Sequence, residues 1–455
     1  MVHASAPVRE AFEPGPTSSL RRPRNPVGLL LWGYISYIVA GWLVLCLPIC
    51  QKSSQATVLD HLFTATSAVS TTGLITVSTG ATYTLAGQAV VALLIQFGGL
   101  GYMTIGSFVM VAVGQRISMT RTRVSEIGLS PPSGISVARF IRSIIIFTVA
   151  IETVGACALL LIFSQRQVPD AWWSAVFHSI SAFCTAGFSL FDDSFVSYRA
   201  HLGLNLVIIA LSYCGAVGFI VLNDLHQRLR RRKLRLSLSS RVILWCTFWL
   251  SLFGTLLLAF DEPTLRSRPL GENLLAALFQ AMTASTTVGF NTVDIGALSA
   301  GSVFLITIIM VVGASPAGTG GGIKTTTLAT LWATMISVFR RRERTNFGDR
   351  ELPPERVRLA TVSAVFYLFL LCLGIYALSL VESAPLPDQV VECASAIGTV
   401  GLSRGITADL TWAGKLIVIV LMFAGRVGPL ALGMTLLQIG RRQPLYYFPR
   451  EDLAI

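Results

Sequence analysis

The sequence predicts an all-α integral membrane protein in which four span–pore helix–span repeats stand in pseudo-fourfold arrangement around a central pore. Two observations carry this prediction. Apolar runs of membrane-spanning length recur along the 455 residues, of which 53% are hydrophobic and only 13% charged. One eight-residue pattern also occurs four times, each time between two apolar runs.

The apolar runs predict eight transmembrane helices, because each can supply the roughly 20 residues that a bilayer crossing needs. They begin near Val27, Thr84, Val137, His201, Val242, Ser302, Val357 and Thr411. Residues 1–25 are polar and hold no apolar run of their own, so they are interpreted as a cytoplasmic tail and not as a cleavable signal peptide.

The net charge of +12 is distributed as expected for a membrane protein. Basic residues gather at both termini and at every second connection between spans: Arg21, Arg22, Arg24, 116–123, 228–235, 340–344, Arg441 and Arg442. This positive-inside pattern predicts a multi-pass protein of the plasma membrane with both termini in the cytoplasm. It argues against nucleic-acid binding, and orientation also accounts for the run at 228–235, which can in addition contact anionic lipids.

The repeated pattern reads [ST]-A-x-x-T-x-G-[LF]. Its copies are Ser67–Leu74, Ser181–Phe188, Thr283–Phe290 and Ser395–Leu402. The glycines of successive copies are 114, 102 and 112 residues apart. Four copies at near-equal spacing predict four equivalent structural units.

A short helix of about 11 to 14 residues is predicted before each T-x-G, too short to cross a bilayer but able to re-enter it. Acidic residues near the helix starts are expected to cap free N–H groups: Asp60, Asp170, Glu272 and Asp388. The opposite helix end, with its unpaired carbonyls, then faces the T-x-G turn. His61 and His178 fall within these helices and are interpreted as packing residues, not metal ligands.

Non-helical backbone at membrane depth is tolerated where it lines a wet cavity, and rings of backbone carbonyls can replace an ion's hydration shell. The candidate filter residues are Thr71, Thr72, Gly73, Thr185, Ala186, Gly187, Thr287, Val288, Gly289, Thr399, Val400 and Gly401. Glycine permits the turn without a Cβ clash, and the threonine adds a hydroxyl. No acidic residue stands in these positions, so a charged ring is not the expected mechanism.

Two further features fall within apolar segments. The sixth span is interrupted at 313–327, where Pro316 and the glycines after it cannot hold a regular helix. Arg426 would lie in the hydrocarbon region of the bilayer. Because a charged side chain is energetically unfavourable there, Arg426 is a candidate functional residue. Glu152 is interpreted either as a structural partner of a neighbouring polar group or as part of a proton relay.

These residues resemble the K+ transporter superfamily of Trk, Ktr and HKT proteins, and the early start of the first span is more similar to its KtrB branch, the membrane subunit of Ktr systems. The resemblance covers the chain from about Pro26 onwards. It implies K+ bound at the filter, with glycine at all four positions associated with K+ selectivity. It also implies a mobile gate below the filter, with these residues: Gly313, Gly318, Gly320, Gly321, Gly322, Lys324 and Arg426.

The same resemblance implies a homodimer, Na+ as a coupled or modulating ion, and a KtrA-like cytoplasmic ring that binds nucleotide; no covalent cofactor is expected. The predicted divisions are a tail at 1–25, repeats at 26–114, 136–227, 241–338 and 357–439, and a cytoplasmic C-terminal segment at 440–455.

Parts of the sequence are also compatible with four alternative functions. The K+-translocating subunit of an ATP-driven pump and a Na+-permeable channel share this architecture, although the pump subunits are generally longer. An intramembrane enzyme needs clustered His, Asp, Glu or Cys, which the spans lack. Nucleotide binding at 318–325 is disfavoured because Ile323 separates Gly322 from Lys324.

Overall fold

The computed structural model describes residues 26–52, 56–101, 137–230, 236–316, 318–348, 350–428 and 432–433. The predicted tail at 1–25, the end of the first repeat at 102–114, most of 429–439 and the segment at 440–455 lie outside the described residues. The basic cluster at 116–123 lies outside them as well.

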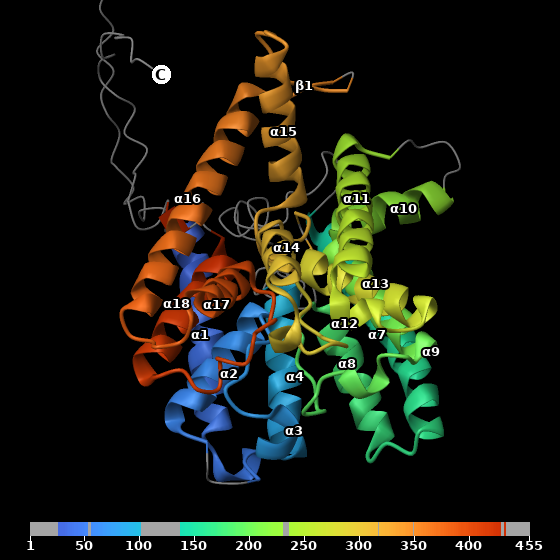
Figure 1. The fold of residues 1–455 in the computed structure, drawn as a ribbon, viewed down its shortest axis with the longest axis vertical. Coiled ribbons are helices and arrows are strands. Elements are labelled where there is room, and N and C mark those ends of the chain that lie inside the picture. Colours follow the sequence, from blue (N-terminus) through green and yellow to red (C-terminus); the bar gives the residue numbers. More distant parts are fainter. Residues whose placement is uncertain are drawn as a thin grey trace, which may run out of the picture.

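The described helices follow one another in four groups (Figure 1). The first group holds α1 (Pro26–Leu45), η1 (Pro48–Cys50), α2 (Val58–Ser70), α3 (Thr79–Thr82) and α4 (Leu85–Leu100). The second holds α7 (Val137–Gln165), α8 (Ala171–Phe183), η2 (Val196–Tyr198), α9 (Leu202–Ala216) and α10 (Gly218–Arg230).

The third group holds α11 (Leu238–Asp261), α12 (Pro263–Arg266), α13 (Leu270–Thr286), η3 (Ile295–Ala297), α14 (Ala300–Val311) and α15 (Thr325–Phe339). The fourth holds α16 (Pro354–Ser379), α17 (Leu386–Gly398) and α18 (Trp412–Val427). An antiparallel hairpin of β1 (Asn346–Phe347) and β2 (Arg350–Glu351) connects α15 to α16 and lies at one end of the molecule, with α3 at the other (Figure 1).

Three helices in the described part are long and apolar enough to cross a membrane: Arg142–Gln165, Leu238–Asp261 and Pro354–Ser379. Five further apolar helices are shorter: Leu31–Leu45, Leu85–Leu100, Leu202–Ala216, Ala300–Val311 and Thr325–Phe339. The sixth expected span falls short because its helix is broken between α14 and α15.

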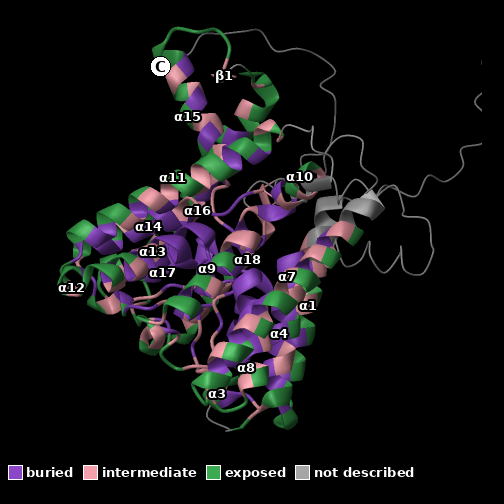
Figure 2. Ribbon diagram, turned by 90° about the vertical axis from the view of Figure 1, so that its right-hand side faces the viewer, coloured by how far each residue is buried: buried purple, intermediate pink, exposed green. Residues whose placement is uncertain are grey.

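Large apolar side chains lie on the outside of the long helices, as expected for a surface that meets lipid. On α11 the exposed fractions of Trp245, Phe253 and Phe260 are 64%, 56% and 74%. The short helices α2, α8, α13 and α17 lie inside, and most of their residues are buried, hydroxyl-bearing ones included (Figure 2). Buried hydroxyl groups thus lie among apolar side chains in the interior, while the outer surface of the long helices is apolar.

The short helices confirm part of the expected pattern and correct another part. Helices α2, α8 and α17 have 13 residues, whereas α13 has 17 and is longer than expected. Only Asp60 takes part in a cap, in a reciprocal pair with Thr57 in which its carboxylate accepts from the Thr57 N–H at 3.0 Å.

The capping prediction is wrong for the other three acids. Asp170 stands at the N-cap of α8 in a left-handed conformation and its side chain makes no cap bond. Glu272 instead binds Arg268 at 2.8 Å, and Asp388 binds Arg404. A guanidinium is a stronger partner for these carboxylates than a helix N–H group, because both groups are charged.

Polar contacts join each group of helices to the next near the starts of the short helices. Ser78 donates to Asp192, and Arg199 pairs with Glu272 at 3.1 Å. The third join is Arg404 Nη2 to the Gly296 carbonyl at 3.2 Å, and the fourth is Lys415 Nζ to Asp60 Oδ1 at 2.7 Å. The fourth contact returns to the first group, so the joins form a closed circuit.

Glu262 stabilises the connection between α11 and α12. Its carboxylate accepts from the backbone N–H groups of Thr264 at 3.1 Å and Ser299 at 3.0 Å. Burial alone would raise the pKa of Glu262, but these donors hold that pKa below its ordinary value.

Candidate functional site

All four T-x-G segments begin with a threonine in the left-handed conformation, which is uncommon for a residue with a Cβ. The φ angles are 52° at Thr71, 50° at Thr185, 57° at Thr287 and 48° at Thr399. The following N–H bonds back to the carbonyl of the first pattern residue, over 2.8 to 3.1 Å. This is the hydrogen bond of a Schellman motif, so one local rule ends all four short helices.

In three of the four copies the first residue of the pattern also holds the turn through its side chain. Ser67 Oγ accepts from the Gly73 N–H, and Ser395 Oγ accepts from the Gly401 N–H, each at 3.0 Å. Ser181 Oγ donates to the Phe188 carbonyl at 2.8 Å. The Thr283 hydroxyl of the third copy is buried and has no hydrogen-bond partner among the described residues, so this side-chain contact accompanies the turn in three copies and is not a requirement for it.

The four glycines pack against one another's neighbours in a closed ring. Each has a positive φ, from 67° to 95°. A Cβ at Gly73 would lie 2.4 Å from the Ala186 carbonyl oxygen, and one at Gly187 would lie 2.3 Å from that of Val288. The series continues from Gly289 to Val400 at 2.2 Å and from Gly401 to Thr72 at 2.3 Å, which closes it. Only glycine permits this approach of backbones.

The interruption of the sixth span lies directly against this ring. Between α14 and α15, residues 312–316 and 318–324 form a loop, whereas residues 325–327, expected to belong to the interruption, are the first turn of α15. Thr71 Oγ1 donates to the Thr319 carbonyl at 3.3 Å, and Thr185 Oγ1 donates to Thr319 Oγ1 at 3.0 Å. Thr287 Oγ1 accepts from the Gly321 N–H at 3.2 Å. The loop thus bonds to three of the four candidate filter threonines.

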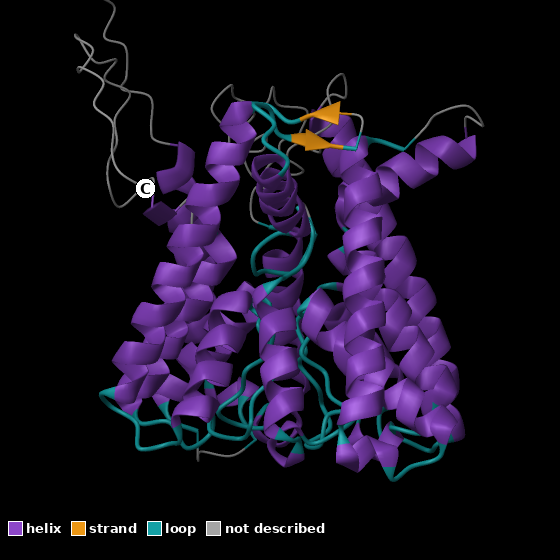
Figure 3. Ribbon diagram, turned by 45° about the horizontal axis from the view of Figure 1, so that its top comes forward, coloured by secondary structure: helices purple, strands orange, loops and turns teal. Residues whose placement is uncertain are grey.

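The loop glycines explain how it packs there. A Cβ at Gly321 would lie 2.3 Å from Thr399 Oγ1, so the loop meets the fourth threonine too. A Cβ at Gly320 would meet Thr287 Oγ1 at 2.2 Å. Gly313, Gly318 and Gly322 would each place a Cβ within 2.1 to 2.6 Å of backbone, and Gly322 has a φ of 71°. Figure 3 shows loop segments running between the helices in the middle of the molecule.

Two basic side chains hold the loop. Lys324 Nζ donates to the Gly320 carbonyl at 2.6 Å. The Arg426 guanidinium, on α18, donates to the carbonyls of Thr319 and Gly98. Arg426 therefore connects the loop to α4, and the structure brings the candidate filter and the candidate gate residues into one site.

Glu152 lies beside the second T-x-G segment and has polar partners there. Gln96 Nε2 donates to its Oε2 at 3.2 Å, and Ser179 Oγ donates to its backbone carbonyl at 2.7 Å. These contacts are those of a residue that ties α4, α7 and α8 together.

Gly98 of α4 lies against the backbone of Val69 in α2. A Cβ at Gly98 would lie 2.0 Å from the Val69 carbonyl oxygen.

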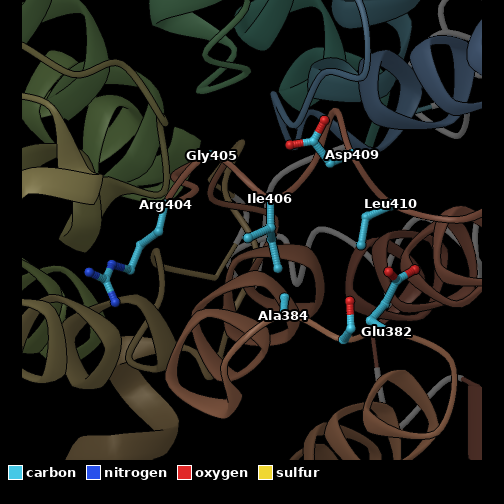
Figure 4. A pocket seen from close by; sticks show the side chains of 8 residues that line it. Glu382, Ala384, Arg404, Gly405, Ile406, Asp409 and Leu410 are labelled. Carbon is cyan, nitrogen blue, oxygen red and sulfur yellow. The ribbon is translucent and has the colours of Figure 1, made fainter.

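The described residues contain no group of three or more His, Cys, Asp or Glu able to hold a metal ion. The oxygens that converge at the site belong to backbone carbonyls and threonine hydroxyls, the ligand type that suits a weakly hydrated cation. No sequence pattern indicated the cavity of about 360 Å³ beside the fourth segment. It is lined by Glu382, Ser383, Ala384, Arg404, Gly405, Ile406, Asp409 and Leu410 (Figure 4).

Comparison with known proteins gives consistent matches along the chain. Residues 35–437 match the family described as cation transport protein, TrkH. The chain is 37% identical to Ktr system potassium uptake protein B of Bacillus subtilis, over 89% of this chain and 92% of the relative. It is 33% identical to the potassium/sodium uptake protein NtpJ of Enterococcus hirae, over 96% and 98%.

Among solved structures, the crystal structure of the potassium transporter TrkH from Vibrio parahaemolyticus superposes with a TM-score of 0.73. The match covers 93% of this chain and 86% of the other, at 19% sequence identity. At that identity the superposition establishes a shared fold.

Proposed function

The chain belongs to the TrkH family of cation transport proteins, and on that premise we propose that it takes up K+ through a path lined by the four T-x-G segments. A member of this family is a membrane transporter and not an enzyme. In this proposal the four helix groups are pseudo-fourfold repeats around one pore, with eight transmembrane helices and the four short helices as re-entrant pore helices. The helix starts lie on the outer side and the basic segments in the cytoplasm.

One observation supports the filter assignment above the others: each filter glycine packs against the carbonyl that precedes the next glycine, and the fourth returns to the first. A closed ring of backbones at this spacing offers carbonyl oxygens from four sides, as the dehydration of a cation requires. The B. subtilis relative, named a potassium uptake protein, supports K+ as the cation.

The loop at 312–324 is proposed as the gate. Its contacts with the filter threonines support a position across the inner end of the ring, where Arg426 adds a positive charge and Lys324 holds the Gly320 carbonyl. A positive charge below the filter raises the energy of a passing cation. Opening then requires Thr319 to move away from Thr71 and Thr185. Arg426 must also release the carbonyls of Thr319 and Gly98.

Regulation from outside the chain forms part of the proposal. Two relatives are named as parts of a Ktr system, which supports a partner subunit. We place a KtrA-like nucleotide-binding ring at the cytoplasmic side, where the α15–β1–β2 region and the basic residues 340–344 are exposed. A homodimer, Na+ coupling or modulation, and a bacterial inner-membrane location complete the assignment.

A Na+-permeable cation channel of the same architecture is the second candidate, since the E. hirae relative is named a potassium/sodium uptake protein. Uptake of ⁸⁶Rb+ into liposomes containing the purified protein separates the two. The assay uses a K+ gradient, no ATP and varied external Na+. Uptake that K+ inhibits strongly and Na+ inhibits poorly supports the K+ assignment. Equal inhibition by K+ and Na+ supports the Na+-permeable channel. If uptake appears only after ATP is added, both candidates are contradicted.

A further inference from the structure

A polar side chain occupies the same place in all four short helices, nine residues before the filter glycine. These residues are Thr64, His178, Gln280 and Glu392. All four are at most 1% exposed. They differ in chemistry, although the filter glycines and threonines beside them are the same in every repeat.

In the second and third repeats this side chain holds the backbone that leaves the filter. His178 Nδ1 donates to the Ser174 carbonyl at 2.7 Å, which leaves Nε2 to accept from the Leu190 N–H at 3.3 Å. The Gln280 amide oxygen, with the amide oriented by its partners, accepts from the N–H groups of Thr292 and Val293 at 3.0 and 3.2 Å. Both side chains are neutral acceptors for the segment just after the glycine.

The fourth repeat has an acid in this place. Glu392 Oε2 accepts from Ser403 Oγ at 2.7 Å, and Oε1 accepts from Thr407 Oγ1 at 2.6 Å. No salt bridge reaches this carboxylate among the described residues. Burying a carboxylate away from water and from basic side chains costs folding free energy. The hydrogen bonds from Ser403 and Thr407 offset part of that cost.

The segment that Glu392 holds runs from the filter to the cavity wall. Ser403 stands two residues after Gly401, and its Oγ accepts in turn from the Gly405 N–H at 3.0 Å. Gly405 has a φ of 102° and no neighbour within 4 Å of a built Cβ, whereas the adjacent Arg404 pairs with Asp388 and donates to the Gly296 carbonyl at 3.2 Å. Figure 4 shows Gly405 and Ile406 in this turn beside the cavity. The Glu392 carboxylate therefore anchors Ser403 and Thr407 on the two sides of the turn, while Arg404 ties its middle to Asp388 and Gly296.

We propose that Glu392 is a positioning residue of the cation path: through Ser403 and Thr407 it holds the outer end of the fourth filter segment in place. This rests on the proposed function of that segment. Because Gly401 contacts Thr72 of the first repeat, a displaced fourth segment also disturbs the neighbouring part of the ring. Loss of the anchor is expected to lower discrimination between K+ and Na+.

The test compares K+ and Na+ binding to the purified full-length protein by calorimetric titration with KCl or NaCl. Glu392→Gln keeps the shape of the side chain but offers one acceptor oxygen in place of two. The substitution weakens the hydrogen bonds from Ser403 and Thr407, which are made to a charged group. If the energy of one such bond holds the K+-selective geometry, the ratio of K+ to Na+ affinity falls about tenfold, which corresponds to about 1.4 kcal/mol. Asp409→Asn is the matched control, because Asp409 is an exposed acid of the same loop; its ratio is expected to stay unchanged.

A double-mutant cycle separates positioning from general damage. With Ser403→Ala already present, Glu392→Gln is expected to change the affinity ratio by much less than tenfold, because the shared contact is already lost. A purely structural role would lower the melting temperature and leave the ratio unchanged. If Glu392→Gln does not fold, Ser403→Ala and Thr407→Val carry the test, since each removes one donor from the same carboxylate.

An unchanged ratio in folded Glu392→Gln overturns the proposal, and so does the same fall in Asp409→Asn, which would indicate surface charge alone. Wild-type protein that prefers K+ in binding but moves no ⁸⁶Rb+ contradicts the proposed uptake function and leaves Glu392's role standing. Wild-type protein that binds both ions equally contradicts K+ selectivity and this inference together.

Discussion

Replacing Gly289 by alanine is expected to damage the filter, because Gly289 makes the closest backbone approach of the four filter glycines. The new Cβ would lie 2.2 Å from the Val400 carbonyl oxygen and 3.0 Å from Gly401 Cα, and both neighbours are backbone. The backbone at Gly289 has a φ of 87°, which costs a residue with a Cβ about 1–2 kcal/mol. Relief of the contact adds about 1–3 kcal/mol of overpacking.

The two effects together amount to about 2–5 kcal/mol, and 1.4 kcal/mol corresponds to a factor of ten. If K+ binding holds the ring in this geometry, its affinity falls by at least about thirtyfold. ⁸⁶Rb+ uptake at equal protein amounts, measured over a range of K+ concentrations, gives this affinity. The control is Gly271→Ala in the first turn of α13, where no atom lies within 4 Å of a built Cβ.

Gly271→Ala is expected to leave uptake unchanged and to stabilise α13 slightly. Gly289→Ala protein with K+ affinity within twofold of the wild type would refute the reasoning, because the ring would then not constrain the ion. Equal damage from both substitutions would show that the assay reports folding and not the filter.

Three further predictions concern the contacts around the site. Arg426→Ala is expected to raise ⁸⁶Rb+ flux several-fold, because the loop loses its tie to α4 and the path loses a positive charge; unchanged flux at equal expression would contradict the barrier role. Lys415→Met is expected to lower the melting temperature by leaving Asp60 buried and unpaired, at a cost of about 3 kcal/mol; Lys415→Met combined with Asp60→Asn should recover part of the loss, and an additive loss would argue against the pair. Folding lowers the pKa of Glu262, so its contribution to stability is complete above its unfolded pKa of about 4.3 and is lost as pH falls through the lower folded pKa. The melting temperature of Glu262→Gln should therefore depend less on pH below about pH 4.3 than that of the wild type. Identical pH dependence of the two proteins would count against this role.

The local parts of the site could be predicted from sequence because each depends on a few neighbouring residues. A threonine and a glycine two residues apart end each short helix, and Pro316 with its glycines interrupts the sixth span. These rules act over one turn of chain. They hold wherever the pattern occurs.

The remaining features depend on residues far apart in sequence. Glu272 was expected to cap α13, but Arg199, which is 73 residues away, and Arg268 bind it instead. The contact of Thr71 with Thr319 spans 248 residues, so no local pattern indicates that the loop lies against the filter. Glu392 was missed for a related reason: its three counterparts share its place but not its chemistry, and a search for identical residues passes over it.

The closed ring of glycine contacts comes from one polypeptide, and this affects how such a filter can change over generations. In a channel assembled from four identical subunits, any substitution appears four times at once, so every step is large. Here a codon change alters one quarter and leaves three intact. Intermediate filters therefore stay available to selection, and the unlike residues at 64, 178, 280 and 392 show that each quarter can acquire its own supporting side chain.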